Sequence, residues 1–197
     1  MFQRLSLLHL FLLLAAAPLV RANSINFTPH TETRTVDGFT VREAFITAGP
    51  RLRYYFTPPA DWIVTGSPET LRFHLVGHPN ACCLISMSSL VPKRYPFTGP
   101  SLEEYRRQAL ATVPQDATDA CIVSETPDFF TLFDWTGLEV VVTYSLNARL
   151  FRASVMFLNI GHDEQMLVVA ARTQAAFDAF RADTMRLLTS WCPQTLP

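Results

Sequence analysis

Alternating apolar and polar positions recur along most of the chain and predict many β-strands. Leu71, Phe73 and Leu75 alternate with Arg72 and His74, which is the pattern of a strand with one buried face. Similar alternation, or a run of β-branched and aromatic residues, predicts further strands at 39–47, 51–57, 62–65, 81–90, 121–125, 129–135, 138–146, 150–160 and 165–171. Short turns separate the later segments, so we expect them to form an antiparallel meander.

Two segments have a helical period instead. Residues 100–113 carry apolar side chains on one face, and Ser101 followed by Glu104 predicts a capping box at the start of that helix. A last helix is expected after Thr173. Its apolar stripe consists of Ala176, Phe177, Phe180, Thr184, Leu187, Leu188 and Trp191. A helix with one apolar face has to cover something, so we expect it to pack on the sheet.

Residues 1–22 have the layout of a secretory signal peptide. Arg4 precedes a leucine-rich run, and Val20-Arg21-Ala22 places small or branched residues where a signal peptidase reads the chain. The apolar run is shorter than the roughly 20 residues that a bilayer span needs, and Pro18 interrupts it. The sequence therefore predicts an exported protein, periplasmic or extracellular, with no transmembrane anchor after cleavage.

The remaining chain has the composition of one globular domain. We expect an extended arm or linker at 23–37 and a single α+β domain at 38–197. Without the two arginines of residues 1–22, the chain has 14 basic and 17 acidic residues, a formal charge of −3. A nearly neutral surface gives no electrostatic basis for binding nucleic acid.

Four cysteines follow the predicted signal peptide: Cys82, Cys83, Cys121 and Cys192. An even number of cysteines in an exported chain indicates disulfide bonds. Adjacent strand residues point to opposite faces, so Cys82 and Cys83 are expected to reach Cys121 and Cys192, in either pairing. Free, buried thiols are the alternative.

The order of elements resembles a known fold family. A strand runs into the corner Pro58-Pro59-Ala60-Asp61-Trp62, and further strands, a Ser-Leu-Glu-Glu-Tyr helix, a meander and an amphipathic last helix follow. Over about residues 50–192 this is similar to the PsbP/Mog1/DcrB-like fold. The resemblance implies an α+β sandwich in which one antiparallel sheet of six to eight strands is flanked by two main helices. Members of this family serve as accessory or regulatory proteins, so the resemblance implies a binding role.

A metal site is the alternative function that the sequence offers. His74, His78, Cys82 and Cys83 are spaced at short intervals, and imidazole and thiolate groups are good ligands for zinc or copper. An exported protein favours oxidised cysteines over thiolate ligands, which argues against a metal. We therefore expect no cofactor.

Dense aromatic residues could instead line a ligand pocket, with Tyr55, Trp62 and Trp135 as candidates. Large aromatic side chains are usually buried, which favours a core position for most of them. No nucleotide-binding, hydrolase or metalloprotease motif occurs in the chain. The sequence therefore predicts a non-enzymatic accessory or binding protein for another envelope protein or a small ligand, and leaves the oligomeric state open.

Overall fold

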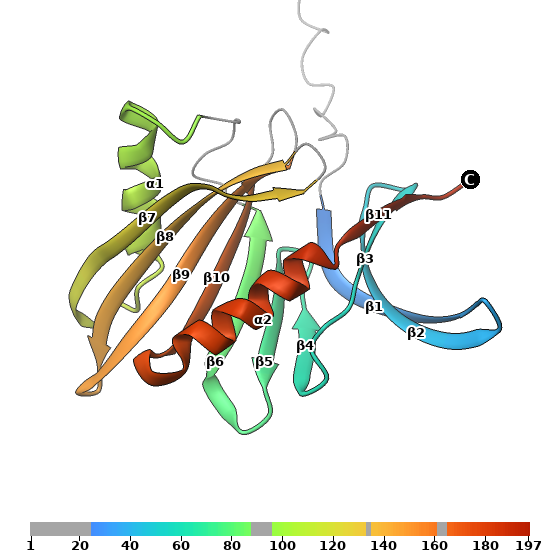
Figure 1. Cartoon of the computed structure of the whole chain (residues 1–197), viewed down its shortest axis with the longest axis horizontal. Coiled ribbons are helices and arrows are strands. Elements are labelled where there is room, and N and C mark those ends of the chain that lie inside the picture. The colour runs from blue at the N-terminus through green and yellow to red at the C-terminus, as the bar shows by residue number, and fades with distance from the viewer. Residues whose placement is uncertain (1–24, 88–95, 133–134, 161–164) are drawn as a thin grey trace, which may run out of the picture.

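The strands form two separate antiparallel sheets (Figure 1). The computed structural model describes residues 25–87, 96–132, 135–160 and 165–197. The seven-stranded sheet has the order β4 (Trp62–Gly66), β5 (Thr70–Leu75), β6 (His78–Met87), β10 (Gln165–Thr173), β9 (Arg149–Asn159), β8 (Trp135–Leu146) and β7 (Thr118–Leu132). The four-stranded sheet has the order β1 (Ile25–Val36), β2 (Phe39–Ala48), β3 (Leu52–Phe56) and β11 (Cys192–Thr195).

Helices pack on opposite faces of the seven-stranded sheet. Helix α1 (Pro100–Ala111) contacts β7 and β8, where Tyr105 and Ala109 pack against Leu138 and Val140. Helix α2 (Phe177–Thr189), preceded by a 3₁₀ turn (Gln174–Ala176), crosses the other face against β9 and β10. Among the described residues, no helix is long and apolar enough to cross a membrane.

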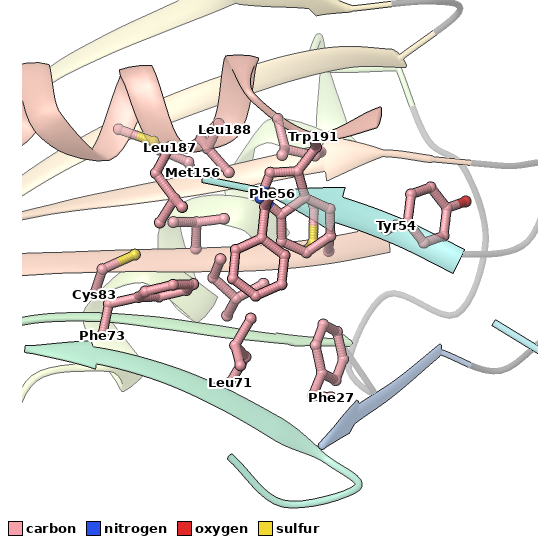
Figure 2. Packing of buried hydrophobic residues seen from close by; sticks show 14 of the residues in the cluster. Phe27, Tyr54, Phe56, Leu71, Phe73, Cys83, Met156, Leu187, Leu188 and Trp191 are labelled. Atoms are coloured by element: carbon pink, nitrogen blue, oxygen red, sulfur yellow. The ribbon is translucent and has the colours of Figure 1, made fainter. Parts of the chain in front are cut away.

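The four-stranded sheet closes over the same face that α2 covers. Phe56 of β3 stacks on Trp191, which follows α2, with ring centroids 5.6 Å apart. Phe56 also meets Phe73 of β5 edge-on at 5.5 Å. Figure 2 shows these rings packed together, with Phe27 of β1 and Leu187 of α2 in the same cluster. One apolar core therefore joins both sheets and α2.

The predicted fold class is wrong, because the chain is mostly β and its strands divide between two sheets. The single sheet expected of a PsbP/Mog1-like sandwich would require all the strands to lie side by side in one sheet. Pro58 and Pro59 lie just beyond Thr57, the residue after β3, and proline has no N–H to donate to a ladder. The chain leaves the four-stranded sheet there, and β4 begins the seven-stranded sheet.

Residues 25–36 of the expected arm form strand β1, which pairs with β2 along most of its length. Hydrogen bonds therefore fix these residues in a sheet. The tight turn at Asp37 and Gly38 joins the two strands, with φ values of 50° and 83°. Residues 1–22, the predicted signal peptide, lie outside the described residues.

The start of α1 differs from its predicted cap, and the last helix begins without a side-chain cap. Gly99 is the N-cap of α1 and Pro100 takes the first helical position, so Ser101 does not cap the helix. Glu104 bonds to Arg107 and Gln108 in the next turn. Thr173 likewise makes no side-chain cap bond.

An ion pair under α2 joins a carboxylate that is nearly closed off from solvent to an arginine that is about one third exposed. Glu139 of β8 is 3% exposed, and Arg181 of α2 donates to both of its carboxylate oxygens, at 2.6 and 2.5 Å. Ser154 of β9 donates a further bond to Glu139. The carboxylate is therefore fully partnered, and it fixes the position of α2 on the sheet.

Removing the cation should leave this buried carboxylate uncompensated. We expect Arg181→Leu to lower the free energy of unfolding by about 3 kcal/mol, measured by urea denaturation. Arg186→Leu, on the exposed side of the same helix, removes the ion pair with Asp183 and should cost less than about 1 kcal/mol. Equal losses for the two variants would contradict this role for Glu139.

Candidate ligand-binding pocket on the four-stranded sheet

The outer face of the four-stranded sheet, which points away from the core, carries a hydrogen-bonded network. Tyr55 donates to Glu32 Oε1 at 2.6 Å, and Arg53 Nη1 donates to Glu32 Oε2 at 2.9 Å. Arg53 Nη1 also lies 3.2 Å from the Tyr55 hydroxyl. The strand period of two places Arg53 and Tyr55 on this face, while Tyr54 and Phe56 of the same strand enter the core.

Phe45 is the apolar centre of this network. The imidazole of His30 stacks on its ring at 5.3 Å, Tyr55 lies at 5.3 Å on another side, and the Arg53 guanidinium lies 4.4 Å from its centroid. These neighbours leave Phe45 only 7% exposed, although it faces away from the core. The outer face therefore has an ordered aromatic and cationic surface of its own.

A pocket of about 350 Å³ opens beside this network. Its lining comes from β2, β3, the end of α2 and β11, and consists of Glu43, Tyr55, Phe56, Thr57, Ser190, Cys192, Pro193 and Gln194. Ser190 accepts the backbone N–H of Thr57 at 3.0 Å and donates to the Leu187 carbonyl at 2.7 Å. That hydroxyl fixes the end of α2 to β3, and so sets the wall of the pocket.

Tyr55 is held as a neutral hydrogen-bond donor. Its burial raises the pKa of the phenol, and the bond donated to Glu32 raises it further, while Arg53 partly offsets both. The ring lines the pocket and its hydroxyl is bonded to Glu32, so the ring has little freedom to turn. The site is thus largely formed before any ligand binds.

Of the three aromatic residues predicted to line a pocket, the structure places Tyr55 there. Trp62 is buried and stacks on Phe180 of α2 at 5.1 Å. Trp135 is buried beside Tyr54, at 5.8 Å. Both tryptophans therefore belong to the core, because α2 and the four-stranded sheet cover the face of the seven-stranded sheet that holds them.

The metal candidates come together only in part. His74 on β5 and Cys82 on β6 face each other in register, and His74 Nδ1 is buried without a hydrogen-bond partner. His78 is exposed and is paired with Leu75 instead, because the ladder is irregular there. Within the described ranges, no three His, Cys, Asp or Glu side chains are placed to hold a metal ion.

None of the expected disulfide bonds is present: Cys82, Cys83, Cys121 and Cys192 are free thiols. Cys83 faces α2 from β6, whereas Cys121 lies on the edge strand β7. Four strand spacings separate these strands, or about 19 Å, and a disulfide needs Cα atoms within about 7 Å. Sequence reasoning could not supply this separation, because it depends on strand order.

A second cavity, of about 450 Å³, lies at one end of the seven-stranded sheet. Its lining includes Phe97, Asp128, Thr136 and Asn159. Segments 88–95, 133–134 and 161–164, which are outside the described residues, adjoin these positions in the sequence. The pocket on the four-stranded sheet adjoins none of these segments and is the better-defined candidate site.

Sequence reasoning missed most of this site. Apart from Tyr55 and Cys192, none of the network or lining residues had been a candidate; they are His30, Glu32, Glu43, Phe45, Arg53, Phe56, Thr57, Ser190, Pro193 and Gln194. The alternation of Arg53, Tyr55 and Thr57 with Tyr54 and Phe56 was the available signal. It marks one face of β3 as polar, but it does not show which strands lie beside it.

Comparisons with known proteins give no family. No protein family matches the sequence, and no curated protein matches it. Among solved structures, a crystal structure of a Pseudomonas aeruginosa protein of unknown function superposes with a TM-score of 0.41. The two are 7% identical, and the match covers 84% of this chain and 98% of that one. A likeness of this degree does not bear on function.

The environments of the four thiols predict their order of reactivity. Cys121 and Cys192 are exposed, and we expect maleimide to label them first in the folded protein. Burial raises the pKa of Cys82, partly offset by Arg72, so its labelling should be slow. Burial and the neighbouring Cys82 raise the pKa of Cys83 further, so Cys83 should react only after unfolding. Mass mapping of labelled peptides measures the order, and rapid labelling of Cys83 in the folded state would contradict it.

Proposed function

We propose that the protein is an exported, non-enzymatic binding protein that recognises a partner protein or a small ligand through the pocket beside Tyr55. The pocket itself carries this proposal. It combines a concave surface, an immobilised aromatic ring and polar side chains on a sheet face that points away from the core. Ligand sites commonly have this composition and a volume in this range.

The chemistry of the lining indicates the kind of group that would fit. Tyr55, Phe56 and Pro193 supply apolar surface, while Glu43 and Gln194 supply polar groups. A side chain or small molecule with one ring or branched aliphatic group and an adjacent hydrogen-bonding group would satisfy both. Because the lining is fixed by Ser190 and Glu32, binding would cost little ordering of the protein.

Export is the second part of the proposal, and the layout of residues 1–22 supports it. The N-terminus of the mature protein, recovered from the periplasm or culture medium, is expected to be Asn23. N-terminal sequencing or intact mass measures it. Protein that stays in the cytoplasm with Met1 retained would refute export and leave the pocket proposal standing.

In-cell photo-crosslinking tests the pocket. A photoreactive residue in place of Gln194 should give a specific adduct with the partner, whereas the same residue in place of exposed Thr126 on β7 should not. Tyr55→Ala should reduce the Gln194 adduct about tenfold, the effect of losing about 1.4 kcal/mol of binding free energy. Mass spectrometry of the adduct quantifies this effect.

The thiols provide a matched control for a small ligand. Cys192 lies in the pocket and Cys121 does not, yet both are exposed. A dialysable ligand from an envelope extract should slow maleimide labelling of Cys192 and leave Cys121 unchanged. Two results together would refute the pocket as the binding site: adducts of equal yield from positions 194 and 126, and equal labelling of Cys192 and Cys121 in the presence of the ligand.

A further inference from the structure

The outer half of β1 has a strand on only one side. Residues 30–36 pair with β2, and no other described strand pairs with them (Figure 1). Val36 and Phe39 flank the two-residue turn, so their backbones form a hydrogen-bonded pair. From there, non-hydrogen-bonded and hydrogen-bonded pairs alternate along β1 and β2. The backbone N–H and C=O groups of Thr31, Thr33 and Thr35 therefore point away from β2, along the free edge.

Two of the features that usually prevent pairing, a proline and a bulge, are missing from the outer half of this edge. The inner half of β1 is occupied, because Phe27 N–H donates to the Pro68 carbonyl. Beyond His30 the register with β2 is regular, and the segment contains no proline. The opposite case is β7, an edge strand with three register shifts and a proline at 127. Free, regular edges of this kind readily accept another strand.

The sequence at this edge is complementary to itself. In an antiparallel pair centred on Thr33, Thr33 meets Thr33, Thr31 meets Thr35, and Glu32 meets Arg34. Threonine pairs are favourable across strands, and the three threonine pairs use the backbone groups that point outward. Centring the pair on Thr31 would bring Thr33 opposite Pro29, and centring it on Thr35 would bring Thr33 opposite Asp37, so either shift loses threonine pairs.

We propose that two copies of this chain associate through β1, antiparallel, with the two-fold axis at Thr33. The two four-stranded sheets then form one continuous sheet. A two-fold axis perpendicular to the sheet places the outer faces of both copies on the same side, so the two pockets beside Tyr55 face in one direction. The proposal does not depend on the ligand, because it rests on β1 alone.

Disulfide trapping tests the register. With Cys121 and Cys192 replaced by serine, Thr33→Cys should give covalent dimers, because paired Cα atoms lie about 5.5 Å apart. Thr35→Cys should give few, since its own copy would lie about 14 Å away along the strand. Mixing Thr31→Cys with Thr35→Cys should restore the crosslink. Non-reducing intact mass distinguishes these products.

Proline substitution tests the free edge in the purified chain, without the cysteine replacements of the trapping experiment. Thr33→Pro removes an outward N–H and leaves the bonds to β2, so the dimer dissociation constant should rise about tenfold or more in analytical ultracentrifugation. Thr40→Pro is the matched control, because its N–H points to the opposite edge of the same hairpin. A monomer at the highest soluble concentration, equal crosslinking from positions 33 and 35, or equal effects of the two prolines would overturn the proposal.

Discussion

The contact between Trp191 and Phe56 holds the two sheets together. Trp191 follows α2, which lies on the seven-stranded sheet, and Phe56 ends β3 of the four-stranded sheet. Strand β11 begins at the next residue, so the stacking also determines where β11 joins β3. Because β11 provides Cys192 and Gln194, the pocket exists only when this aromatic contact has formed.

Two kinds of burial support the structure around that contact. Most of the shared core is apolar and is stabilised by removing side chains from water, which has no directional preference. The Glu139–Arg181 pair is directional, since both guanidinium donors have to meet both carboxylate oxygens. Apolar packing therefore drives α2 onto the sheet, and the ion pair limits the positions in which it can stay.

Local structure could be predicted from the sequence much better than architecture. The strand at 71–75 and the helix from residue 100 are confirmed, because alternation and helical period are local properties of the chain. The division into two sheets was missed, since strand pairing is set by contacts between distant residues. Strand β11 was missed for the same reason: its four residues include Pro193 and have no alternating pattern.

The candidate site follows the same rule. Tyr55 could be singled out as an aromatic residue, but its partners come from 23 residues earlier, at Glu32, and from the end of the chain, at Cys192. Only the order β1-β2-β3-β11 brings them to one face. The same order leaves the outer half of β1 without a neighbour. The proposed pocket and the proposed dimer edge are thus two consequences of one strand order, in which β1 is the edge strand of the four-stranded sheet.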